Sequence, residues 1–183
     1  MRAVPQPGAV ILRTFIPGNP KTKGSLKPYP TRKRNGTVIC ILKEQVIGSE
    51  NWKNVMIEHF SAIIQDPTKF DRSLLCPFDG ACELEARFML PRPPSVKTKY
   101  PTSQFDGDLD KLMRNLGDAL EQSGVLNNDA RLVDETIIKR FADNCNPGIF
   151  VTVKVKSEDR DDSEEDMRTY VSRLWAKDWV EGA

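Results

Sequence analysis

Two amphipathic helical segments set among strand-like runs constrain the fold of this chain more than any other feature. Residues 49–65 and 109–122 each carry apolar side chains at three- and four-residue spacing, which is typical of a helix with one buried face. Strand-like runs are predicted around them, at residues 10–16, 37–41, 81–90, 132–141 and 149–156. The order β-β-α-β-α-β-β predicts an α/β (α+β) fold, in which both helices pack on one side of a small mixed sheet.

The segments between these elements contain proline, glycine and polar residues. Residues 21–34 are predicted to form a basic loop, and the Asn35-Gly36 pair predicts a turn into the next strand. Residues 91–107 are predicted to form a second long loop, of a length that often has a function. The last two strands are predicted to form a hairpin around residues 144–148.

The chain is predicted to form one domain over residues 1–156 and a separate tail over residues 157–183. The tail starts with an acidic run at 157–166, which predicts a flexible linker. Beyond it, apolar residues between Met167 and Trp175 recur at helical spacing and predict a short amphipathic helix. We expect that helix to pack on the protein's own dimer rather than to recruit another partner.

Composition excludes several classes of site. The four cysteines form no CxxC pair and have no companion histidines, so a zinc site is not expected. His59 is the only histidine, and its place near the apolar face of the first helix predicts a structural role. No apolar run approaches the length of a membrane span, and the N-terminus shows no secretory signal. We therefore expect a cytoplasmic protein that does not act at a membrane.

Charge is distributed unevenly although the net charge is only +1. Residues 1–43 contain nine Lys and Arg side chains and no acid, whereas residues 157–166 contain seven acids and one Arg. Such an asymmetry indicates a polyanionic partner at the basic end, although a solvated basic loop would give the same pattern. The candidate phosphate contacts are Lys21, Lys23, Lys27, Arg32, Lys33 and Arg34.

Three aspartates form the candidate catalytic group. Asp108 precedes the second helix, Asp110 lies in its first turn, and Asp129 lies in the turn before the next strand. Carboxylates without nitrogen or sulfur ligands suit a hard cation such as Mg²⁺, which can activate water and neutralise charge at phosphorus. The spacing alone leaves a structural alternative open. Aspartate also caps helices, and Asp110, Arg114 and Asp118 have the spacing of a surface ion-pair ladder.

The segment from Asp108 to Val133 resembles the signature of the RusA family of Holliday junction resolvases. Asp108-Leu109-Asp110 is similar to the first two catalytic acids and Asp118-Ala119-Leu120 to a middle block. Asp129-Ala130 with Val133 resembles the third acid and its strand, and Gly18 to Gly24 resembles a loop after the family's first strand. The family's Lys is Arg114 here, the Asn after its second acid is Lys111, and the first acid of its turn is Asn128.

The resemblance implies a small α/β fold in a bacterial or phage-encoded enzyme. It further implies a homodimer that resolves four-way DNA junctions by paired symmetric nicks, in recombination and repair. Asp108, Asp110 and Asp129 would hold Mg²⁺ or Mn²⁺, and Arg114 would contact the scissile phosphate. Two alternatives remain open. One is another metal-dependent nuclease, although Glu83-Leu84-Glu85 lacks the lysine of a restriction-like site. The other is a DNA-binding protein without catalysis.

Overall fold

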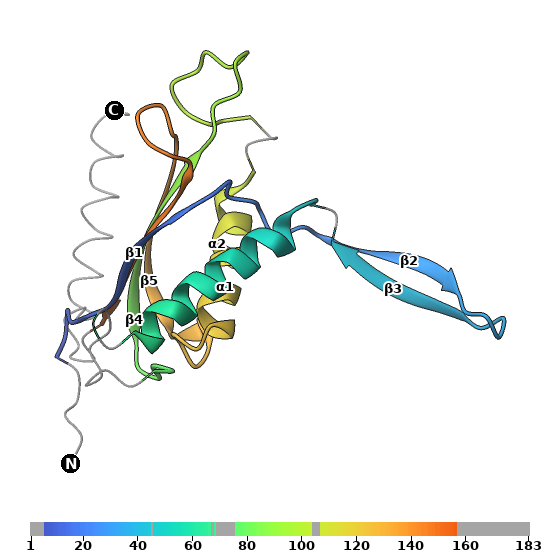
Figure 1. Ribbon diagram of the computed structural model, residues 1–183, viewed down its shortest axis with the longest axis horizontal. Helices are drawn as coiled ribbons and strands as arrows, with labels where there is room; N and C mark the ends of the chain where they lie inside the picture. Colours follow the sequence, from blue (N-terminus) through green and yellow to red (C-terminus); the bar gives the residue numbers. More distant parts are fainter. Residues whose placement is uncertain (1–5, 45, 67, 69–75, 104–106, 157–183) are drawn as a thin grey trace, which may run out of the picture.

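The computed structural model describes residues 6–44, 46–66, 68, 76–103 and 107–156. A four-stranded mixed sheet forms its centre (Figure 1). The strands lie in the order β1 (Val10–Pro17), β6 (Gly148–Val155), β4 (Cys82–Leu90) and β5 (Leu132–Phe141). Only the β4–β5 pair is parallel. The predicted mixed α+β fold is therefore confirmed.

Both long helices cover the same face of this sheet (Figure 1). α1 (Ser49–Gln65) buries Trp52, Met56 and Phe60, which are spaced four residues apart and so lie on one side of the helix. α2 (Leu109–Gln122) buries its own apolar stripe, including Leu112, Leu116 and Leu120. The helices thus close a single hydrophobic core over the sheet.

β4 supplies the middle of this core because its side chains alternate strictly between the two faces of the sheet. Cys82, Leu84, Ala86, Phe88 and Leu90 are buried under the helices. On the opposite face, Glu83 and Glu85 form ion pairs with Lys154 of β6. His59 of α1 is hydrogen-bonded to the Thr14 hydroxyl of β1 at 2.8 Å, in agreement with its predicted structural role.

The predicted hairpin of the last two strands is wrong. The turn at residues 144–148 does connect β5 to β6, but β4 lies between these two strands. A parallel pair such as β4–β5 needs a crossover connection, and the segment that contains α2 provides it. The turn sequence predicts a change of chain direction, whereas the crossover decides which strands become neighbours.

The prediction of a loop over residues 21–34 is also wrong in part. Residues Leu26–Arg32 form β2, which pairs antiparallel with β3 (Val38–Glu44) as a separate two-stranded ribbon. The ribbon extends away from the sheet and helices (Figure 1). Its turn is closed by the Lys33 amide, which donates to the Thr37 carbonyl at 2.8 Å, and by Gly36 at a φ of 84°.

Within the described residues, no helix is long and apolar enough to cross a lipid bilayer. The acidic run at 157–166 and the predicted helix after it lie outside the described residues. The proposed division of the chain at residue 156 therefore stays a prediction.

The packing of β4 predicts a strong response to truncation at its centre. Leu84 is fully buried, so Leu84→Ala should lower the free energy of unfolding by about 2–5 kcal/mol, because it removes transfer energy and leaves a cavity. Val133 on the edge strand β5 is 60% exposed, and Val133→Ala should cost less than about 1 kcal/mol. Urea unfolding followed by circular dichroism measures both. Equal losses would contradict this assignment of the core.

Candidate functional site

Asp108 and Asp110 stand at the exposed start of α2. Asp108 occupies the residue before the helix, with extended backbone angles, but its carboxylate makes no capping hydrogen bond. It pairs instead with Lys111 at 2.9 Å, and this contact lowers the pKa of Asp108. Asp110, in the first turn, lies 3.5 Å from Arg114. The capping explanation for Asp108 therefore fails, because its carboxylate is directed to a neighbouring lysine and not to the helix amides.

Gly107 fixes the approach of the chain to these acids. Its φ of 79° lies in the left-handed region, and a Cβ at this position would clash with the methyl group of Thr22. The Gly107 carbonyl accepts a hydrogen bond of 2.7 Å from Lys139 of β5. The residue before Asp108 is therefore held between the N-terminal loop and the sheet.

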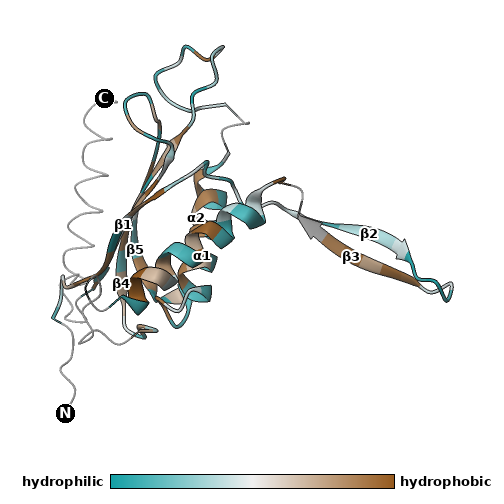
Figure 2. Ribbon diagram, viewed as in Figure 1, coloured by the Kyte–Doolittle hydropathy of each residue, from teal (hydrophilic) through white to brown (hydrophobic). Residues whose placement is uncertain are grey.

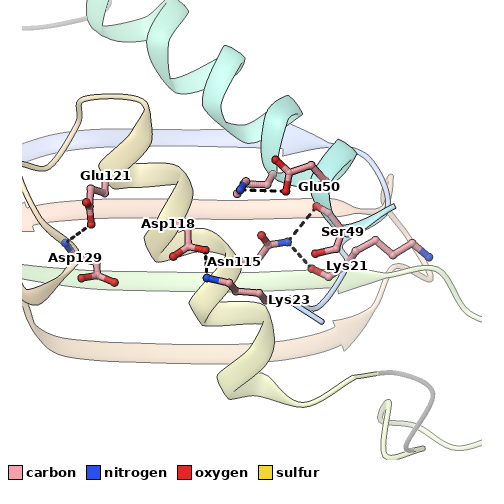
Figure 3. Close-up of polar contacts among 9 residues, drawn as sticks. Lys21, Lys23, Ser49, Glu50, Asn115, Asp118, Glu121 and Asp129 are labelled. Atoms are coloured by element: carbon pink, nitrogen blue, oxygen red, sulfur yellow. Dashed lines mark hydrogen bonds and ion pairs between the residues drawn. The ribbon is translucent and has the colours of Figure 1, made fainter. Parts of the chain in front are cut away.

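Asp129 reaches the same helix from the other side. It begins the short 3₁₀ helix η2 (Asp129–Arg131), whose first turn is capped by the Asn128 side chain. The Asp129 amide donates to Glu121 of α2 at 3.3 Å (Figure 3). Gly117 faces this turn, and a Cβ there would lie 3.6 Å from the Asp129 Cβ. A Cβ at Gly117 would thus be in ordinary van der Waals contact with Asp129, so α2 and this turn lie directly against each other.

A pocket of about 440 Å³ opens between α2, η2 and β5. It is lined by Asp110, Met113, Arg114, Gly117, Asp129, Leu132, Glu135 and Ile137. Asp110, Arg114 and Asp129 were predicted site residues, and the structure brings these three together. Asp108, also predicted, lies at the same end of α2 but does not line this pocket.

Glu135 of β5 was not identified from the sequence. Its side chain lines the pocket, and burial together with the neighbouring charge of Asp129 raises its pKa. Strand periodicity offered a signal, since Glu135 lies two residues before Ile137 and so shares its face of β5. The pocket therefore holds three carboxylates from three different elements, facing one arginine.

The predicted ion-pair ladder on α2 forms only in part. Arg114 contacts Asp110, and both side chains are more than 60% exposed. Asp118 pairs with Lys23 of the N-terminal loop instead (Figure 3). Arg114 therefore has one acidic neighbour on its own helix and a guanidinium at the rim of the pocket.

The six predicted phosphate contacts separate into two groups. Lys21 and Lys23 lie beside α2, where the buried Asn115 amide donates to the Lys21 carbonyl at 3.0 Å (Figure 3). The Lys23 amide donates to the Lys111 carbonyl at 3.0 Å. The other four residues, Lys27, Arg32, Lys33 and Arg34, are exposed on the ribbon and its turn. The basic sequence thus supplies two features. One is a strap along α2, which contains Lys21 and Lys23, and the other is a projecting arm, the ribbon of β2 and β3.

The donor chemistry of the pocket fits a hard divalent cation. Asp110, Asp129 and Glu135 offer oxygen atoms only, and Mg²⁺ is commonly bound by one or two carboxylates plus water and phosphate oxygens. Within the described part of the chain, no three His, Cys, Asp or Glu side chains are gathered closely enough to form a complete metal site. A cation here would therefore need ligands from the substrate or the solvent.

Comparison with known families gives one match. Residues 17–154 match the family described as Endodeoxyribonuclease RusA, and this region spans both the acids and the basic ribbon. No individual curated protein matches the chain. The matched region covers well over half of the sequence and contains every described helix and the strands β2 to β6 except Val155, whereas β1 lies outside it apart from Pro17. The chain belongs to the RusA family of endodeoxyribonucleases, the Holliday junction resolvases.

Proposed function

We propose that this protein is a Mg²⁺-dependent homodimeric endonuclease that resolves four-way DNA junctions by paired symmetric nicks. Mn²⁺ would serve in place of Mg²⁺. The proposal places it in DNA recombination and repair in the cytoplasm of a bacterium, on cellular or phage DNA. The observation that supports it most is that Asp110, Asp129 and Arg114 line one pocket. The pocket lies beside α2, the helix that begins directly after Asp108.

The acids that line the pocket, together with Asp108 at the start of α2, would hold the cation. We assign Asp108, Asp110 and Asp129 as its ligands, with Glu135 as a fourth carboxylate within the same pocket. The bound ion would supply an activated water and neutralise charge on the phosphate. Asp108 would have to exchange its Lys111 partner for this role, and its exposure at the start of α2 leaves it free to do so.

Arg114 would stabilise the transition state. Its guanidinium lines the pocket next to Asp110 and donates hydrogen bonds only, so it suits the oxygens of a phosphate. A donor aimed at developing charge accelerates a reaction more than one that binds the ground state. We therefore assign the arginine a role at the scissile phosphate.

The basic residues would contact the phosphates of the junction arms. Lys21 and Lys23 flank α2, whereas Lys27, Arg32, Lys33 and Arg34 lie on the projecting ribbon and its turn. These contacts give affinity without reading bases. Two such subunits related by a two-fold axis would match the near two-fold symmetry of a four-way junction.

A labelled synthetic junction incubated with the protein and Mg²⁺ tests the proposal. Symmetric nicks near the crossover, absent when EDTA is added, are the expected result. The alternative is a junction-binding protein without catalysis. The observation that favours it is that the described carboxylates do not form a complete metal site. That alternative predicts a gel shift without nicks in Mg²⁺ or Mn²⁺.

The ligand assignment predicts three inactive variants. Asp108→Asn, Asp110→Asn and Asp129→Asn should each abolish cleavage, because each removes a ligand charge, while junction binding is retained or strengthened. Asp134→Asn is a matched control, since Asp134 pairs with Lys156 and does not line the pocket. Single-turnover cleavage and gel shifts measure both properties. Cleavage at the wild-type rate by any of the three variants would remove that residue from the ligand set.

The ribbon predicts a strong dependence of junction binding on salt. Replacing Arg32, Lys33 and Arg34 together by Ala should make the log–log slope of affinity against salt shallower by about 2 to 3, because each phosphate that the protein neutralises contributes about 0.9 to the slope. Fluorescence anisotropy from low to moderate salt measures the slope. An unchanged slope would show that the turn of the ribbon is solvated in the complex.

Arg114 separates a catalytic from a structural role. Arg114→Ala should leave thermal stability nearly unchanged, because an exposed ion pair contributes little, and it should reduce single-turnover cleavage by about 10²–10³. Arg114→Lys should recover much of the rate, although it cannot make a bidentate contact. Full activity of the Ala variant would assign Arg114 to the ion pair with Asp110 alone.

A further inference from the structure

The ribbon formed by β2 and β3 has an apolar surface that is exposed among the residues that the structure describes. Val38 and Leu42 of β3 are each 60% exposed, and Ile41 is 36% exposed. Figure 2 shows β3 as hydrophobic over its part nearest the turn, whereas the strand ends with the charged residues Lys43 and Glu44. Among the described residues, the extensive contacts of each ribbon strand are with the other strand. Two strands alone are only marginally stable in water, so this surface needs a partner.

The two outer edges of the ribbon differ in their capacity to pair. The Lys33–Thr37 hydrogen bond shows which residue pairs of the ribbon are hydrogen-bonded to each other. Along each strand, the backbone N–H and C=O groups of one residue face the other strand, and those of the next residue face away from it. The positions with outward backbone groups are then 28, 30 and 32 on β2, and 38, 40 and 42 on β3. Pro28 and Pro30 have no amide hydrogen, so the β2 edge is protected against strand addition. The β3 edge has no such protection.

The distribution of charge on the ribbon indicates what kind of molecule binds the exposed edge of β3. Residues 38–42 are Val-Ile-Cys-Ile-Leu, without a charged side chain, whereas the cations lie on β2 and the turn. A nucleic acid would gain no ion pair with its phosphates from these residues. A second copy of the same edge meets no charge repulsion and is apolar on both faces. Joining the two ribbons produces a four-stranded sheet, which passes the three-strand limit for independent stability.

We propose that β3 pairs antiparallel with β3 of a second copy of this chain, across a two-fold axis at Cys40. This register uses all three outward positions, because Cys40 faces Cys40 of the partner and Val38 faces Leu42 of the partner. The prolines of β2 close both outer edges of the new sheet. The two basic turns then lie at opposite ends of it. The inference adds the contact surface to the homodimer of the proposed function and rests on it for the two-fold symmetry alone.

Cross-linking at Cys40 tests the register. Opposed residues in a hydrogen-bonded antiparallel pair lie about 5.5 Å apart at Cα, within the range of a disulfide. Copper-phenanthroline oxidation of the native protein should therefore give a disulfide-linked dimer on a non-reducing gel. Cys40→Ser should abolish this band. Cys145→Ser is the matched control, because Cys145 is the other exposed thiol, and it should retain the band.

A second cysteine position makes the test specific for the register. Val38→Cys in the Cys40→Ser background faces Leu42 of the partner and not its own copy. It should therefore cross-link poorly with itself, whereas Val38→Cys combined with Leu42→Cys in the same background should cross-link well. A dimer band that depends on Cys145, or equal cross-linking of all these variants, would overturn the proposed pairing.

A charge placed at the axis tests the contact without cross-linking. Cys40→Lys puts two ammonium groups opposite each other, so light scattering should report a monomer where the wild type is a dimer. Thr31→Lys, on β2 of the same ribbon, is the matched control and should remain dimeric. A Cys40→Lys dimer would overturn the proposal. If that dimer also bound the junction more tightly than the wild type, the result would indicate that DNA covers the β3 edge.

These outcomes are separate from those of the nuclease assay. A chain that cross-links through Cys40 but never cuts a junction supports the strand pairing and contradicts the proposed catalysis. A chain that cuts junctions as a dimer but fails the Cys40 tests retains its function and loses this interface. Circular dichroism confirms that each variant keeps the central sheet and helices.

Discussion

The buried face of α2 is the contact on which the rest of the structure depends. Leu112, Leu116 and Leu120 are packed between α1 and the sheet, and the helix also forms the crossover that makes β4 and β5 parallel. Because that face is buried, the opposite side of α2 must be exposed, and Asp110 and Arg114 lie there. The hydrophobic effect therefore decides which way the carboxylates of α2 face, although the carboxylates themselves contribute nothing to the hydrophobic stabilisation.

Polar contacts refine what this packing positions. Asn115 is the buried polar residue of α2, and its amide holds the basic strap by the Lys21 carbonyl. Lys23 of the strap forms an ion pair with Asp118, so the charge of this acid on α2 is neutralised within the fold. Asp110, Asp129 and Glu135 line a pocket without such a lysine partner within it, and Arg114 is the cation on its rim. Carboxylates that face one another across a pocket repel, and that repulsion gives a bound cation its advantage.

The ribbon contrasts with the central domain, since the described residues of its own subunit leave its apolar strand exposed. Its apolar strand and its basic turn require different partners, one without charge and one anionic. Assigning the β3 edge to a second subunit and the turn to DNA satisfies both requirements. Dimer assembly and substrate contact would then use neighbouring parts of one arm, so the spacing between the two active sites would be set by a pair of strands.

The sequence by itself determined the helices, the β4 alternation and the candidate acids, because each depends on local periodicity or on residue type. It also carried the family resemblance, on Asp108, Asp110 and Asp129, which the match over residues 17–154 confirms. The tertiary structure decided what depends on partners distant in the chain. It placed β4 between β5 and β6, turned the basic loop into a ribbon and added Glu135 to the pocket. The sequence of β5 has the same local preference for a strand beside β4 as beside β6. The burial of α2 against the sheet selects β4 as its neighbour, because α2 lies in the connection between β4 and β5.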